Sequence, residues 1–148
     1  MCLIINDKYH TDRTPKVATQ PILVWKVLES ATEKQAVSPY QGATWRFGVQ
    51  KKVNFSFTQT GDITSVGAGL HAFISKDCRS ISRMVINWYH VYATVYPAVI
   101  PVGAEYFIGS NDEIVSTQLT VYKTVAECLA AFGATEFAPG IPLNSLMV

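Results

Sequence analysis

The stretch Gly69-Leu70-His71-Ala72-Phe73-Ile74-Ser75-Lys76-Asp77-Cys78-Arg79 contains the change of period on which the fold prediction rests. A glycine leads into a short apolar segment that is typical of a buried strand, and Ser75 is a favourable helix N-cap. The residues that follow carry an apolar stripe at helical spacing, formed by Cys78, Ile81, Val85 and Trp88. This pattern predicts the principal helix over about residues 76–90. His71 lies inside the preceding strand, where a ring nitrogen could face a ligand.

Strand patterns dominate the rest of the chain. Ile22–Leu28 is apolar almost throughout and rich in β-branched and aromatic residues, which predicts a strand buried on both faces. Thr94–Ile100 predicts a second strand, in which Pro97 indicates a sheet edge or a bulge. Glu113–Lys123 predicts the longest strand, with one face made by Val115, Thr117, Leu119 and Val121.

The remaining segments complete a single-domain prediction. Thr124 and Glu127 form a capping box for a short C-terminal helix that ends at Gly133. Residues 8–20 predict an exposed loop, and the polar residues 30–38 fit either a helical turn or a loop. No linker divides the chain, so the sequence predicts one α+β domain over residues 1–148, with mainly antiparallel sheets, one principal helix and a short C-terminal helix.

Composition narrows the classes of partner. The 148 residues are 49% hydrophobic and 16% charged, whereas charged residues make up about a quarter of an average protein. Such a surface is compatible with burial against a partner or against further copies of the chain, as in a homo-oligomer. The formal net charge of +1 and a single basic doublet, Lys51-Lys52, give no footprint for nucleic acid, and the doublet is interpreted as a solvated turn.

Cysteine and histidine spacing argues against disulfide and metal chemistry. The cysteines are odd in number and widely spaced, which does not fit a set of disulfides: Cys2, Cys78 and Cys128. The histidines lack the spacing of metal ligands: His10, His71 and His90. A reducing compartment therefore suits the chain. No apolar run reaches the roughly 20 residues of a membrane span, and the first residues lack a signal-peptide pattern. We therefore expect a cytoplasmic protein with no membrane partner.

Two residues invite a chemical interpretation. Cys2 would become an N-terminal nucleophile after removal of the initiator methionine, although a small residue opening a buried strand is the simpler interpretation. Glu113 stands where a turn enters a strand, so its carboxylate would lie at the rim of a sheet; a solvated acid at a strand end is the alternative. The chain has no phosphate-binding glycine loop and no nucleophile elbow.

The order of these segments resembles the ADP-ribosyltransferases of the poly-ADP-ribose polymerase type. Residues 69–75 resemble the Gly-x-Tyr-Phe-Ala-Asp segment of that family, and residues 96–107 resemble its following strand and glycine turn. Residues 111–116, Asn-Asp-Glu-Ile-Val-Ser, are similar to its Asn-Glu-Tyr-Ile-Val segment. The resemblance implies an ADP-ribosyltransferase-like fold, with NAD or an ADP-ribose-like nucleotide as the ligand. The residues taken by themselves assign no cofactor.

The resemblance also implies roles for individual residues. His71 takes the position of the tyrosine that stacks on NAD, and Glu113 that of the catalytic glutamate. The implied ligand-binding residues are Trp25 in the same pocket, Lys26 and Tyr106 near its rim, and Lys26 or Arg46 on phosphate. The His-Gly motif of the family would fall at residues 24–27, which read Val-Trp-Lys-Val. A scaffold that binds its ligand without catalysis is therefore favoured.

A second resemblance concerns origin. The opening Met-Cys-Leu-Ile, together with residues 22–28, 38–40 and 69–71, is similar to a group of small proteins encoded by phages and bacteria. Three functions stay open. The first is an accessory protein that binds a nucleotide-derived ligand or a host protein, for host takeover or anti-defence. The second is a mono-ADP-ribosyltransferase that uses NAD, and the third is a structural component of a virion, whose low charge and aromatic residues would suit packing against neighbours.

Overall fold

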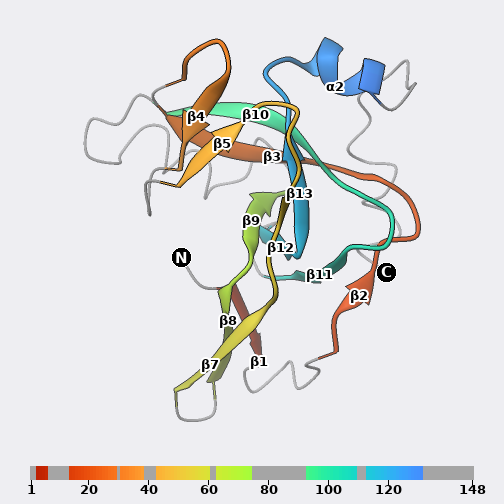
Figure 1. Ribbon diagram of the computed structural model, residues 1–148. Helices are drawn as coiled ribbons and strands as arrows, with labels where there is room; N and C mark the ends of the chain where they lie inside the picture. The colour runs from red at the N-terminus through yellow and green to blue at the C-terminus, as the bar shows by residue number, and fades with distance from the viewer. Residues whose placement is uncertain are drawn as a thin grey trace.

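The computed structural model describes residues 3–6, 14–29, 31–38, 43–60, 63–74, 93–109 and 113–131 (Figure 1). The predicted principal helix at residues 76–90 lies outside these ranges, as do Cys2, Cys78, His10 and His90. The described residues form a mostly antiparallel fold with one short helix, α2 (Val125–Ala131). The broad prediction of mainly antiparallel sheets is therefore confirmed.

Most strands belong to one large sheet whose neighbours all pair antiparallel. Its path runs through β2 (Lys16–Val17), β11 (Glu105–Ile108), β12 (Glu113–Ser116), β9 (Leu70–Phe73), β3 (Ile22–Glu29), β10 (Ala93–Ile100), β13 (Gln118–Val121) and β6 (Lys51–Lys52). A hairpin of β4 (Gln35–Val37) and β5 (Thr44–Arg46) extends from β3. The hairpin replaces the turn or loop predicted at residues 30–38, and β2 lies within the predicted loop at 8–20.

A smaller sheet extends from the lower end of the large one in Figure 1. It contains β1 (Leu3–Asn6), β8 (Ile63–Ala68) and β7 (Ser56–Thr60), with β8 in the middle. The two sheets meet in a small apolar cluster, in which Val66 of β8 packs with Phe107 and Val115 of the large sheet.

The large sheet closes on itself at Thr117. β12 and β13 are separated in sequence by this one residue, yet β12 pairs with β9 while β13 pairs with β10. Both β9 and β10 pair with β3. The strands β9, β3 and β10 and the bent segment from β12 to β13 therefore form a closed ring. The single strand predicted over Glu113–Lys123 is wrong, because the segment bends in the middle to change its partner.

Side chains and backbone groups at the bend replace the ladder bonds that a straight strand would make. The Thr117 N–H donates to the Glu105 carbonyl at 3.0 Å, and the Val53 N–H donates to the Thr117 carbonyl at 2.9 Å. The Glu105 N–H donates to Thr117 Oγ1 at 3.1 Å, and Ser116 Oγ donates to the Gln118 carbonyl at 2.9 Å. The bend is therefore fixed by specific hydrogen bonds.

The bend also changes which face of the segment is buried. Val115, before the bend, belongs to the cluster between the two sheets, whereas Leu119 and Val121, after it, belong to the main core. The predicted shared face of Val115, Thr117, Leu119 and Val121 is therefore wrong. Regular alternation requires a continuous pleat, and the pleat is interrupted at Thr117.

The main core occupies the inside of the ring. The β4–β5 hairpin adds Trp45 to this core. Every strand of the ring contributes buried side chains to it, namely Val24, Leu28, Ala72, Ala98, Ile100, Ile114, Leu119 and Val121. On the other face of β3, Val27 packs with Phe73. The prediction that the strand beginning at Ile22 is buried on both faces is thus confirmed in part: Val27 is buried on the second face, whereas Leu23 and Trp25 on that face are half-buried.

Pro97 lies in an internal strand. The register between β10 and β3 continues without a shift from Ala93 to Ile100, and β13 lies on the other side of β10. The Pro97 carbonyl accepts a hydrogen bond from the Tyr122 N–H at 2.9 Å, so the position of the missing proline N–H also faces β13. The predicted bulge is wrong, because the register with β3 has no shift. The predicted edge is confirmed locally, because among the described strands the missing donor falls where the β13 ladder has already ended at Val121.

The helix α2 begins where the sequence predicts. The Glu127 N–H donates to Thr124 Oγ1 at 3.1 Å, which confirms Thr124 as the N-cap. The helix packs beside β10 and buries Cys128 (Figure 1). The predicted end at Gly133 lies outside the described residues. No helix in the described ranges is long and apolar enough to cross a membrane.

The junction between the two sheets gives a test of the packing. A Cβ at Gly69 would lie 2.4 Å from Val115 Cγ2 and 3.3 Å from the Phe55 ring. Val115 is fully buried, so Gly69→Ala should lower the free energy of unfolding by roughly 1–3 kcal/mol through overpacking. Urea denaturation measures this loss. The control is Gly67→Ala, whose Cβ would first meet Thr58 Oγ1 at 3.1 Å. Equal losses in both variants would contradict the packing at Gly69.

Candidate functional site

Three of the predicted site residues lie on one face of the large sheet. Phe73 is paired with Glu113 on one side and with Trp25 on the other, and His71 is two residues before Phe73 in the same strand. Paired residues and residues two apart point to the same face. Trp25, His71 and Glu113 therefore share the face of β3, β9 and β12 that is turned away from the main core, which we call the outer face.

His71 and Glu113 are diagonal neighbours on the outer face. His71 pairs with Val115, two residues from Glu113, and such diagonal positions lie about 7–8 Å apart. Both side chains are half-buried, as is Trp25. A ligand the size of one nucleoside would span this separation. The structure thus places the polar side chains of two neighbouring strands close together, whereas from the sequence alone their proximity was only a hypothesis.

Burial controls the charge of both polar groups. Burial, together with a smaller contribution from the positive charge of Lys26, lowers the pKa of His71 from its ordinary value of 6.5 to about 4. The imidazole is therefore neutral at neutral pH, with one nitrogen that donates and one that accepts a hydrogen bond. Burial also raises the pKa of Glu113, since the carboxyl group is partly withdrawn from water.

Lys26 and Tyr106 lie on the opposite side of the sheet from this group. Lys26 follows Trp25 directly, so its side chain points into the ring, and Tyr106 is buried in the main core. Burial raises the pKa of the Tyr106 hydroxyl. The sheet therefore separates both residues from the outer face. The structure does not bring them to the rim of one pocket with His71.

Arg46 occupies a third location. It is the last residue of β5, and its side chain is exposed. Its neighbour Trp45 pairs with Ala36 and points into the main core instead. Arg46 is thus part of the exposed side of the β4–β5 hairpin.

Inside the ring, two lysines contact one tryptophan. Lys26 Nζ lies 5.1 Å and Lys51 Nζ 4.4 Å from the centre of the Trp45 ring, within range of cation–π attraction. Lys26 is only 9% exposed, and its Nζ donates to the His71 carbonyl at 2.5 Å. Sequence reasoning missed this arrangement, although a lysine in the middle of the apolar segment Ile22–Leu28 was a visible signal.

The environment disfavours the charge of Lys26. Burial, with a smaller contribution from the positive charge of Lys51, lowers the pKa of Lys26 from its ordinary value of 10.5 to about 8. Burial also lowers the pKa of Lys51. Lys51 is half-buried and paired with Leu119, so the interpretation of Lys51-Lys52 as a solvated turn is wrong.

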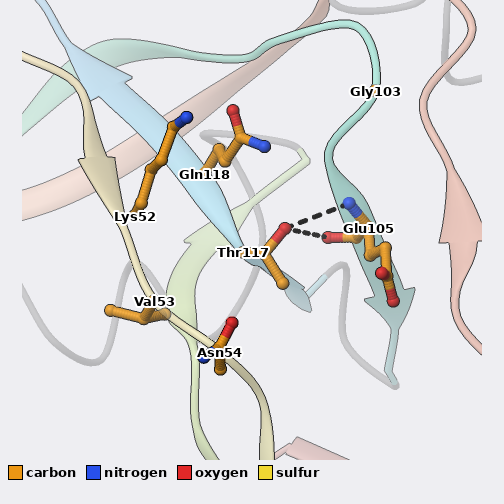
Figure 2. Close-up of a pocket in the computed structure, with 7 residues that line it drawn as sticks. All are labelled: Lys52, Val53, Asn54, Gly103, Glu105, Thr117 and Gln118. Carbon is orange, nitrogen blue, oxygen red and sulfur yellow. Dashed lines mark hydrogen bonds between the residues drawn. The ribbon is translucent and has the colours of Figure 1, made fainter.

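A polar groove opens at the bend of the ring (Figure 2). Its volume is about 390 Å³, and it is lined by Lys52, Val53, Asn54, Gly103, Glu105, Thr117 and Gln118. None of the six predicted site residues lines it. The sequence offered no signal for this groove, because its walls come from three distant segments.

Among the described residues, the one cysteine thiol is unreactive and the residue types that bind metals are scattered. Burial raises the pKa of the Cys128 thiol to about 11, so the thiol is protonated at neutral pH and a poor nucleophile. Within the described ranges, no three histidine, cysteine, aspartate or glutamate side chains are grouped so that they could hold a metal ion.

Comparison of the chain with models of protein families, with curated proteins and with solved structures finds no match. The resemblance to ADP-ribosyltransferases is therefore neither supported nor opposed by a relative.

Lys26 makes stability depend on pH. Between pH 8 and 10.5 the unfolded state binds more protons at this site than the folded state, so stability rises with pH in that window. The full difference corresponds to roughly 3 kcal/mol. Lys26→Met should remove this rise and increase stability at pH 7, as measured by urea denaturation between pH 7 and 9.5.

The control for this measurement is Lys34→Met, because Lys34 is exposed. It should retain the rise of the wild-type protein. Tyrosine and cysteine ionisation affects all three proteins alike, so the comparison isolates Lys26. An identical pH dependence in Lys26→Met and the wild-type protein would contradict the burial of the ammonium.

Proposed function

We propose that this protein binds a nucleotide-derived ligand on the outer face and does not transform it. The observation that supports the proposal is the register of β3, β9 and β12, which aligns Trp25, His71 and Glu113 on neighbouring strands. The proposal also fits the roles that the resemblance implies for His71 and Glu113. Binding, rather than turnover, would serve a phage accessory protein in host takeover or anti-defence, by sequestering a nucleotide signal in the cytoplasm of the host.

The three side chains match the parts of a nucleoside. A neutral His71 ring offers a flat surface for stacking and one donor and one acceptor. The Glu113 carboxylate accepts hydrogen bonds from the ribose hydroxyls. Trp25 adds aromatic surface on the adjacent strand. A base between the rings and a ribose at Glu113 is the arrangement that we propose.

Catalysis would require a further group that holds nicotinamide against the reacting carbon. In the ADP-ribosyltransferases that the sequence resembles, a His-Gly motif holds nicotinamide. The matching strand of this chain carries Trp25 and Lys26 instead, and Lys26 points into the core. Only the carboxylate has a candidate. This difference favours a binding protein over a mono-ADP-ribosyltransferase.

The proposal predicts which substitutions weaken binding. Thermal shift and calorimetric titration with NAD, ADP-ribose and cyclic nucleotides should identify at least one ligand. His71→Ala and Glu113→Gln should each weaken it at least tenfold, which is about 1.4 kcal/mol. The control is Glu127→Gln, since Glu127 is an exposed carboxylate on α2. If both site variants bind as the wild type does, the outer face is not the site.

Two further readouts separate the alternatives. Release of nicotinamide from NAD by the wild-type protein, lost in Glu113→Gln, would replace the binding function by mono-ADP-ribosyltransfer. If no nucleotide raises the melting temperature, the proposal fails. Recovery of the chain in purified virions would then favour the structural role.

A further inference from the structure

The polar groove of Figure 2 follows from the bend at Thr117. The segment before the bend is flanked by Glu105, and the segment after it by Val53 and Lys52. Thr117 binds both sides, through its N–H and its carbonyl. Beyond these two bonds the flanking segments separate, and the space between them is the groove.

The two walls carry opposite charges. Figure 2 shows Lys52 and Glu105 on opposite sides of Thr117, with the two side chains extending toward opposite ends of the groove in this view. Both side chains are exposed. Among the described residues, neither the Lys52 ammonium nor the Glu105 carboxylate has an ion-pair or side-chain hydrogen-bond partner. The described residues of the groove therefore present one cationic and one anionic side chain to whatever enters it.

The floor is polar and largely fixed. The Thr117 hydroxyl is held by the main chain of Glu105, and Gln118 Oε1 accepts a hydrogen bond from Gln50 Nε2 at 2.5 Å. The Asn54 amide, in contrast, has no partner among the described residues. It can donate to a carbonyl and accept from an N–H, which is the pattern of a peptide group.

Size and chemistry together define a ligand class. The volume of about 390 Å³ falls within the range of roughly 300–1,000 Å³ that is typical of small-molecule sites. None of the described residues that line the groove is aromatic, so these residues offer a nucleobase no stacking surface. A ligand with an ammonium and a carboxylate group would pair with Glu105 and Lys52, respectively.

We propose that this groove binds a zwitterionic ligand, namely an amino acid or a short peptide with free termini. The ligand carboxylate binds Lys52, the ligand ammonium binds Glu105, and Asn54 hydrogen-bonds to the peptide group between them. This site is independent of the outer face, because Trp25, His71 and Glu113 do not line it. Either proposal can fail without the other.

The test uses alanine, dialanine and trialanine, each titrated into the full-length protein by NMR. At least one of the three should bind. N-acetylation, which removes the ammonium, and C-amidation, which removes the carboxylate, should each weaken the best binder at least tenfold. Ribose is the negative control. As a neutral polyol it could hydrogen-bond to the Asn54 and Gln118 amides but could not form an ion pair with Lys52 or Glu105, and it should not bind.

Two variants assign each charge to its partner. Lys52→Met should bind the free and the C-amidated peptide equally, and Glu105→Gln should bind the free and the N-acetylated peptide equally. The matched controls are Lys34→Met and Glu33→Gln, both at exposed positions before β4, and they should retain the wild-type discrimination. The proposal is overturned if none of the three ligands binds, if the blocked peptides bind as well as the free ones, or if ribose binds instead.

Discussion

The hydrogen bonds of Thr117 are the constraint on which this fold depends. They hold a bend that lets one segment, residues 113–121, serve as the partner of β9 in its first half and of β10 in its second. Without the bend, the large sheet would remain open and its apolar face would have no opposite wall. With it, a few short strands enclose a core from nearly all sides. The separation of the flanking segments, and thus the groove, follows from the same bend.

The closed ring gives the sheet two faces of different character. Inside, Lys26 shares the core with Trp45 and is held by the His71 carbonyl, so a strand residue of the outer face is tied through its main chain to a buried ammonium. Outside, the half-buried His71 and Glu113 remain next to each other on adjacent strands. Burial, and to a smaller extent the positive charge of Lys26 across the sheet, lowers the pKa of His71 and keeps the imidazole neutral, although the two side chains point in opposite directions.

Local patterns predicted the parts of this structure that depend on local physics. The apolar segment from Ile22 became a strand that is buried on its core face and at Val27 on the other, and Thr124 became the cap of α2. The bend at Thr117 was not predictable, because the alternation of apolar and polar residues along Glu113–Lys123 does not indicate where the segment changes from one partner strand to another. β4 was missed because its segment is polar and short. At the candidate site, the sequence proposed His71 and Glu113 individually, whereas their shared face and the separation of Lys26 and Tyr106 follow from strand register. The groove is built from three segments and had no local signature.

The pairing of β3 has a consequence for how this protein is made. The principal partners of β3 are β9 and β10, and the ring closes only when β13 is available. Because ribosomes deliver the chain from its N-terminus, β3 leaves the ribosome before these partners and stays without them until they have been made. It is also one of the most apolar segments in the sequence, with strong β propensity. The nascent chain therefore exposes an aggregation-prone strand until β9, β10 and β13 have been synthesised. The yield of folded protein in the cell should depend on chaperones that shield β3 during this time.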